Sequence, residues 1–280
     1  MPLSRTAPRL GERHAGWGIL GRVLDRAADR AWIQPVILTV PGRDRDCVTA
    51  IVQALSDQPG FHPAIVVEDR DNQGAAESTR QALMRAGESG GHVLFLEDDL
   101  RMDEEAPARI AATYFPDGVG IISFCDMREV PEFSPAGTYR FDAMGCDGRG
   151  WWGNQALLIH IDIVRMVARV DWFSPEVEQA IGIRVHKLTY GDDGRNCSDI
   201  RLSLLVASHG KDRCDYAVSV PSLFLHVGHV SMCFPGRTIG ERGTRNWIGD
   251  RRRFGIDATL EGQKSVPAVG ISNVPTVVGR

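Results

Sequence analysis

The fold is decided by residues 92–100, which read HVLFLEDDL. The four apolar residues after the histidine have the length and composition of a buried strand. They are followed directly by Glu97, Asp98 and Asp99, whose carboxylates repel one another unless a cation or water takes up the charge. We therefore expect a buried strand that delivers three carboxylates to a binding site. The alternative is that the acids lie in the first turn of a helix over residues 98–115.

Two strand-and-helix units precede this stretch. Apolar runs at residues 34–42 (QPVILTVPG) and 62–70 (HPAIVVEDR) predict two strands. Residues 44–56 (DRDCVTAIVQALS) and 74–86 (GAAESTRQALMRA) have the apolar spacing of amphipathic helices. Because strand and helix alternate with short connections, we expect a parallel sheet with helices packed on its faces.

The three expected strands all end in polar or turn residues. Pro41 and Arg43 follow the first strand, Asp69 follows the second, and the three acids follow the third. In a parallel sheet the carboxyl ends of the strands meet at one edge, and ligands bind beyond that edge. This edge is therefore the expected binding site.

The composition excludes some classes of partner. The 280 residues include 32 Lys and Arg against 36 Asp and Glu, so no overall positive field indicates nucleic acid or membrane binding. No run of about 18 apolar residues and no secretory signal are found, so we expect a cytoplasmic protein without a membrane span. The six scattered cysteines form no CxxC pair and are expected to be thiols.

The second half of the chain is less regular. Strands are expected within residues 118–125 and 154–160, and helices are expected from Ser174 and Ser198 onward. We expect an N-terminal extension (1–34), one catalytic α/β domain (35–235) and an Arg-rich tail (236–280). The catalytic domain divides into a nucleotide-sugar-binding half (35–125) and an acceptor half (126–235).

Four short segments, taken in order, resemble those of GT-A glycosyltransferases. VLFLEDDL looks like their DxD-type metal motif in its LEDD form, and VILTVPGRDR is similar to their first strand and turn. SDIRLSLL resembles the segment that carries the catalytic base of inverting members, and PSLFLHVGHVS resembles their late histidine segment. The resemblance implies a Rossmann-type, mostly parallel central sheet with helices on both faces.

The resemblance also implies a metal site for Mn²⁺ or Mg²⁺. Asp99 would be the direct ligand, and Asp98 would act through water or a neighbouring group. Glu97 would contact ribose or sugar hydroxyls. His226 would be the remote ligand, with His229 as a rival three residues later. Carboxylate oxygens suit these hard cations, which also take phosphate oxygens from a substrate.

The resemblance assigns the base catalyst to Asp199, at the first turn of its helix, with Asp192 and Asp193 as competitors. It places Trp151 or Trp152 at the junction of donor and acceptor, where one indole would stack on a sugar or a base. We choose Trp152 for this contact. The remaining contacts expected with the nucleotide and its diphosphate come from Thr39, Pro41, Arg43, Asp69 and Arg237.

These expectations describe a metal-dependent glycosyltransferase that uses a nucleotide-sugar donor. UDP is the favoured nucleotide, and inversion at the anomeric carbon is the favoured stereochemical outcome. The acceptor hydroxyl could belong to a glycan, a small molecule or a modified DNA base. A sugar nucleotidyltransferase is an alternative, but it requires a Gly-rich, Lys-containing phosphate loop, and VPGRDRD contains no lysine. A carbohydrate- or nucleic-acid-binding module without turnover is a second alternative.

Overall fold

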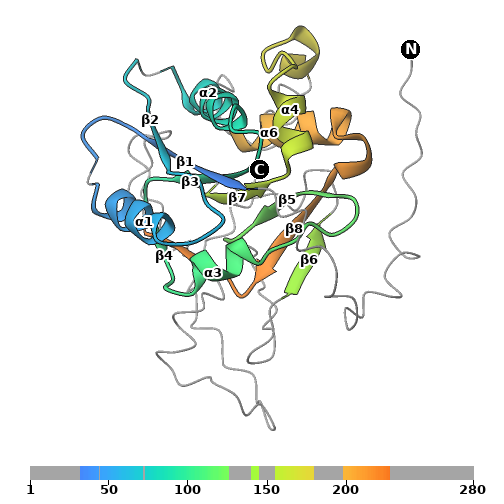
Figure 1. Ribbon diagram of the computed structural model, residues 1–280. Helices are drawn as coiled ribbons and strands as arrows, with labels where there is room; N and C mark the ends of the chain where they lie inside the picture. The colour runs from blue at the N-terminus through green and yellow to red at the C-terminus, as the bar shows by residue number, and fades with distance from the viewer. Residues whose placement is uncertain are drawn as a thin grey trace, which may run out of the picture. The chain divides into compact units, whose positions relative to one another are not determined.

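A computed structural model describes residues 32–43, 45–71, 73–125, 140–144, 155–179 and 198–227 of the chain (Figure 1). The strands are β1 (Ile33–Thr39), β2 (Ile65–Glu68), β3 (His92–Glu97), β4 (Leu100–Met102), β5 (Val119–Ser123), β6 (Arg140–Met144), β7 (Ala156–Ile159), β8 (Asp215–Val220) and β9 (Phe224–His226). The helices are α1 (Asp46–Ser56), α2 (Ala75–Gly87), α3 (Ala106–Ala111), α4 (Ile161–Val167), α6 (Ser198–His209) and the 3₁₀ turn η1 (Lys211–Arg213).

A seven-stranded mixed sheet forms the centre, in the order β2-β1-β3-β7-β5-β8-β6. β1, β2 and β3 are parallel to one another, as are β5 and β8, while β7 is antiparallel to both of its neighbours and β6 to β8. Helices α1 and α3 cover one face, and α2, α4 and α6 cover the other (Figure 1). The expected α/β sheet with helices on both faces is confirmed. None of the helices in the described ranges is long and apolar enough to cross a membrane.

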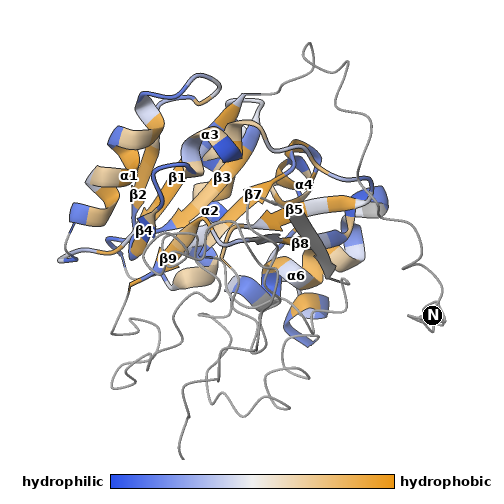
Figure 2. Cartoon of the chain, turned by 90° about the horizontal axis from the view of Figure 1, so that it is seen from below, coloured by the Kyte–Doolittle hydropathy of each residue, from blue (hydrophilic) through white to orange (hydrophobic). Residues whose placement is uncertain are grey.

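β3 is buried because its side chains supply both layers of the core. Val93 and Phe95 pack with residues of α2, α4 and α6, whereas Leu94 and Leu96 pack with residues of α1 and α3. All four are at most 1% exposed, which confirms the buried strand expected from the sequence. The alternation follows from the two-residue period of an extended chain. In Figure 2 the central strands, β3 among them, are coloured as hydrophobic.

The first strand begins at Ile33, two residues before the expected start of the domain at residue 35. Ile33 is paired with His92 in the parallel register of β1 and β3 and is 5% exposed. Gln34 is also buried, and its amide donates to the carbonyl oxygens of Pro35 at 3.0 Å and Pro63 at 2.8 Å. These contacts extend the sheet toward the N-terminus.

A second, two-stranded sheet places the late histidine beside the acidic cluster. Leu100 to Met102 form β4, which pairs antiparallel with β9, and Leu100 lies opposite His226. The backbone N–H of Val227 donates to the carbonyl oxygen of Asp99 at 2.8 Å and extends this pairing. The alternative that the acids begin a helix is therefore wrong, because the chain continues from them as a strand.

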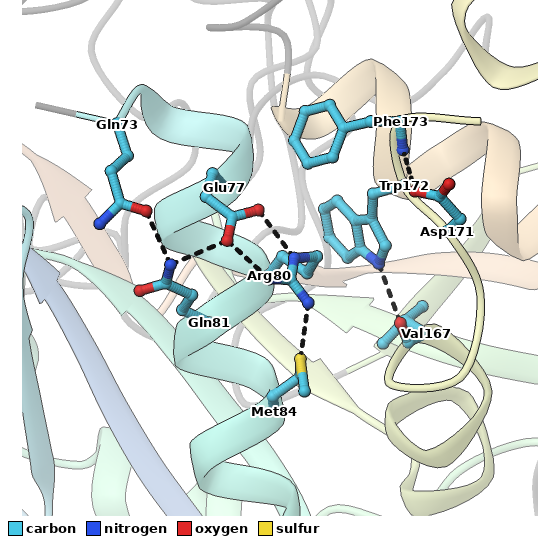
Figure 3. A network of polar contacts seen from close by, with 9 residues as sticks. All are labelled: Gln73, Glu77, Arg80, Gln81, Met84, Val167, Asp171, Trp172 and Phe173. Carbon is cyan, nitrogen blue, oxygen red and sulfur yellow. Dashed lines mark hydrogen bonds and ion pairs between the residues drawn. The ribbon is translucent and has the colours of Figure 1, made fainter. Parts of the chain in front are cut away.

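Polar contacts occur within α2 and within the segment that follows α4 (Figure 3). On α2, the guanidinium of Arg80 donates to the carboxylate of Glu77 at 2.6 and 2.7 Å. After α4, the indole of Trp172 is fully buried and donates to the carbonyl oxygen of Val167 at 2.9 Å. From α6, the buried Arg201 donates to the carbonyl oxygen of Trp172 at 2.9 Å, which holds the first turns of α6 against this segment.

Two histidines contact each other at the edge of the sheet opposite the acidic cluster. The rings of His92 and His160 lie 4.7 Å apart between centroids, and both contact Phe115. The Nδ1 atoms accept hydrogen bonds from the backbone N–H groups of Ile161 at 3.1 Å and Asp162 at 3.2 Å. Burial above all, and then neighbouring positive charge, lowers the pKa of each ring to about 4.

These histidines should make the protein less stable in weak acid. Their pKa lies below the unfolded value, so the unfolded chain binds more protons and the free energy of unfolding falls as the pH drops below about 6.5. The matched variant is His160→Asn, which keeps a side-chain acceptor for the Asp162 N–H and removes one titrating ring. Between about pH 7.5 and pH 5, we expect its melting temperature to fall by about 2–4 °C less than that of the wild type. Equal falls in the two proteins would contradict this account.

Candidate metal centre

Two of the three acids and one histidine meet at the carboxyl end of β3. Glu97 is the last residue of β3, and Asp99 lies in the turn between β3 and β4. Asp99 Oδ2 lies 3.3 Å from His226 Nε2, a distance set by the pairing of β4 with β9. One potential ligand atom each from Glu97, Asp99 and His226 lies within 4.8 Å of the others. This is the spacing of groups that can share one cation.

Asp98 contacts Thr39 and Arg43 rather than His226. Its Oδ2 accepts a hydrogen bond from the Thr39 hydroxyl at 2.7 Å, and its Oδ1 accepts one from Arg43 Nη1 at 3.0 Å. The same Arg43 nitrogen donates to Asp99 Oδ2 at 2.8 Å. Asp98 therefore joins the end of β1 to the turn after β3 and orients Arg43, while Asp99 and Glu97 face His226.

The electrostatics differ sharply between the two acids beside His226. Burial, and then repulsion from Asp99, raises the pKa of Glu97 to about 8. Burial alone would also raise the pKa of Asp99, but hydrogen bonds and attraction from His226 and Arg43 lower it to about 2. Burial opposes the charge of His226, yet the hydrogen bond and charge of Asp99 raise its pKa. One carboxylate thus remains charged, and the other is easily kept neutral.

Two buried acceptor atoms near this edge have no hydrogen-bond partner among the described residues. They are Asp99 Oδ1 and Gln155 Oε1. Gln155 lies beside the end of β3, because its carbonyl oxygen accepts the N–H of Glu97 at 2.9 Å. A buried polar atom without a partner is costly, so such atoms point to a ligand. Together with an imidazole and a second carboxylate, Asp99 Oδ1 offers a donor set that fits Mn²⁺ or Mg²⁺.

Asp199 lies near the same cluster. It occupies the first turn of α6, and its negative charge contributes to the raised pKa of Glu97. The side chain of Arg201, two residues further along α6, donates to the Trp172 carbonyl and pairs with Glu178 at 2.8 Å. These contacts hold the start of α6, which carries Asp199, against the segment after α4.

Two further residues expected at the nucleotide, Pro41 and Asp69, lie along the same edge. Pro41 is exposed in the turn after β1, directly before Gly42, whose φ of +80° favours glycine. Asp69 follows β2, where its Oδ1 accepts the Gln73 N–H at 2.9 Å and its own N–H donates to Thr39 O.

Glu68, the last residue of β2, was expected only as a polar strand end, and it pairs with Arg45 and Arg70. Its position directly before Asp69 was the available signal.

Several sequence-based assignments lie outside the described residues. These are Trp151, Trp152, Asp192, Asp193, His229 and Arg237. The choice between His226 and His229 as the remote ligand therefore rests on the geometry of His226 alone. That geometry places the imidazole, 6% exposed, against the carboxylate of Asp99.

Comparisons with known proteins do not place this chain. No known protein family matches it, and a search of curated proteins finds no significantly similar sequence. The site's chemistry therefore has to be inferred from its own residues.

Proposed function

We propose that the protein is a metal-dependent glycosyltransferase of the GT-A type, which moves a sugar from a nucleotide-diphosphate sugar to an acceptor hydroxyl. The observation that carries this proposal is the convergence of Glu97, Asp99 and His226 at the carboxyl edge of parallel strands. Ligands of such sheets bind beyond that edge. We favour UDP as the nucleotide of the donor.

Glu97, Asp99 and His226 would hold the divalent cation. When bound there, the cation would act as a Lewis acid that stabilises negative charge on the departing diphosphate. The charged Asp99 and the neighbouring Arg43 favour an arrangement in which diphosphate oxygens complete the coordination, since such cations rarely have an all-protein shell.

The proposed transfer forms a bond between the acceptor oxygen and the anomeric carbon of the donor and breaks the bond from that carbon to the diphosphate. The diphosphate leaves with the bonding electron pair, and the acceptor's proton passes to the carboxylate of Asp199. Asp199 suits this role because it is anchored at the start of α6 and lies near the acids, as its effect on Glu97 indicates. The anomeric centre would be inverted.

A thermal-shift panel tests the proposal. UDP-, GDP-, CMP- and dTDP-sugars and the nucleoside triphosphates are each added with and without Mn²⁺. A ligand at about a hundred times its Kd stabilises the folded protein by about 2.7 kcal/mol, which is an increase in melting temperature of about 5–10 °C for a chain of this size. We expect that increase for a UDP-sugar only when Mn²⁺ is present. A response to triphosphates alone would favour a nucleotidyltransferase, and no response would favour a binding module.

A further inference from the structure

Arg43 is paired with the carboxylate of Asp99, the group that the proposed metal would also contact. Its Nη1 lies 2.8 Å from Asp99 Oδ2 and 3.0 Å from Asp98 Oδ1, so one nitrogen bridges two carboxylates. The carboxylates are 13% and 8% exposed, and the arginine side chain is 22% exposed. In a site this enclosed, charges interact more strongly than they do in water.

We infer that Arg43 is an internal counter-ion of Asp99 that opposes binding of the metal alone and binds the diphosphate of the donor once the metal is present. This inference rests on the proposed function and adds an order to it, because metal and diphosphate would bind strongly only together. A guanidinium and a divalent cation that lie against one carboxylate group repel each other. Arg43 therefore opposes binding of the metal alone.

Two observations suit Arg43 to a change of partner. It follows Gly42, which has a φ of +80°, in the connection between β1 and α1, and its side chain is 22% exposed. Asp98 also accepts a hydrogen bond from the Thr39 hydroxyl at 2.7 Å, so it keeps a partner when the guanidinium turns to a phosphate. Arginine is suited to the second role because its planar group donates to phosphate oxygens in pairs.

The charges around Arg43 give the same order. Without metal, its guanidinium offsets part of the negative charge of Asp98 and Asp99. A lone divalent cation would add two positive charges beside this guanidinium, whereas a cation with a diphosphate adds little net charge. Diphosphate should therefore increase the affinity for metal, and by reciprocity metal should increase the affinity for diphosphate.

The test compares wild type with Arg43→Gln by titrating Mn²⁺ alone, followed by its paramagnetic resonance signal, and then pyrophosphate in the presence of Mn²⁺. Arg43→Gln should bind Mn²⁺ alone about tenfold more tightly, because the competing charge is gone. It should bind pyrophosphate with Mn²⁺ about tenfold more weakly, because a charge-assisted hydrogen bond is lost. The matched control is Arg45→Gln, since Arg45 pairs with Glu68 rather than with the three acids, and its Mn²⁺ affinity should not change.

Each outcome decides a distinct point. Equal or weaker binding of Mn²⁺ by Arg43→Gln, with wild-type binding intact, overturns the counter-ion role and leaves the proposed function in place. Tighter Mn²⁺ with unchanged pyrophosphate affinity overturns the diphosphate role. Failure of the wild type to bind Mn²⁺ even with pyrophosphate present overturns both the proposed function and this inference.

If Arg43→Gln does not fold, Arg43→Lys takes its place. Because it keeps the charge but not the planar fork, it should keep its Mn²⁺ affinity within about twofold and lose about threefold in pyrophosphate affinity. A loss of Mn²⁺ affinity in this variant would contradict the inference.

Discussion

Replacing Asp99 by asparagine should abolish metal-dependent binding of the nucleotide sugar. We expect Mn²⁺ affinity to fall by about a hundredfold, and the Mn²⁺-dependent rise in melting temperature on adding a UDP-sugar to disappear. The physical reason is that Asp99 is the acid of the cluster that stays charged, with a pKa of about 2. Glu97, whose pKa is raised to about 8, cannot supply the same charge at neutral pH without first losing a proton.

The same substitution should also lower the stability of the metal-free protein. The pKa of Asp99 is lower in the folded than in the unfolded chain, so its charged form stabilises the fold above its ordinary pKa, and that contribution is lost as the pH falls toward about 2. Three adjoining acids alone suggest that removing one would relieve repulsion, but Arg43 and His226 reverse this expectation. A lower melting temperature for Asp99→Asn at neutral pH, measured without metal, would confirm the reversed sign.

Asp98→Asn is the matched control, because the two acids are adjacent and equally charged. The Asn side chain retains a carbonyl oxygen for the Thr39 hydroxyl, and Asp98 does not belong to the group of potential ligands. We expect this variant to lose much less Mn²⁺ affinity than Asp99→Asn. If both variants lost it equally, the assignment of the ligands by geometry would be wrong. If Asp99→Asn bound Mn²⁺ as tightly as the wild type, the metal site would have to lie elsewhere.

The sequence was sufficient to predict the first half of the sheet because its signals are local. The apolar run before Glu97 and the amphipathic spacing of Val48, Ile51 and Leu55 each lie within one element, and these three residues are buried on α1. The position of the acids at the ligand edge follows from the parallel order of β1, β2 and β3.

Local patterns could not predict the partners of the acids, because these depend on long-range pairing, and His226 was expected beside Asp99 only from the resemblance. His226 reaches Asp99 through the register of β4 with β9, two three-residue strands far apart in the sequence. Such short strands carry too little periodicity to reveal their pairing. The bridge from Arg43 to Asp98 and Asp99 depends on the conformation of the turn after β1, which its sequence, PGRDR, does not specify. Glu97 could be identified as a third potential ligand only once the contacts of Asp99 with His226 and Arg43 were known.

Replacing Asp199 by asparagine should abolish transfer while the donor still binds. A positioned general base typically contributes about a hundredfold to ten-thousandfold, so we expect a loss of that size. Water can stand in for the acceptor, and the release of UDP from a UDP-sugar is then the readout. Removing the base should lower kcat and leave the Mn²⁺-dependent thermal shift unchanged, because Asp199 is not one of the three potential ligands. Wild-type release of UDP would show that Asp199 is not the base.

A control is needed because an acid at the first turn of a helix also stabilises the helix dipole. Asp162 occupies the same position at the start of α4, on the opposite edge of the sheet from the acids. Asp162→Asn should therefore lose about as little stability as Asp199→Asn, about 0.3–1 kcal/mol, and keep its activity. Equal activity in the two variants would show that Asp199 has only a structural role.

A second readout tests the position of Asp199 without any turnover. Its charge helps to raise the pKa of Glu97 to about 8, so the Asp199→Asn variant should show a lower pKa for Glu97 in carbon-13 NMR of its carboxyl group. Asp162→Asn should leave that pKa unchanged. If the pKa of Glu97 fell and the release of UDP also fell, Asp199 would be placed beside the cluster and in the reaction. If the pKa did not respond, Asp199 would lie too far from Glu97 to act on a sugar bound at the metal centre.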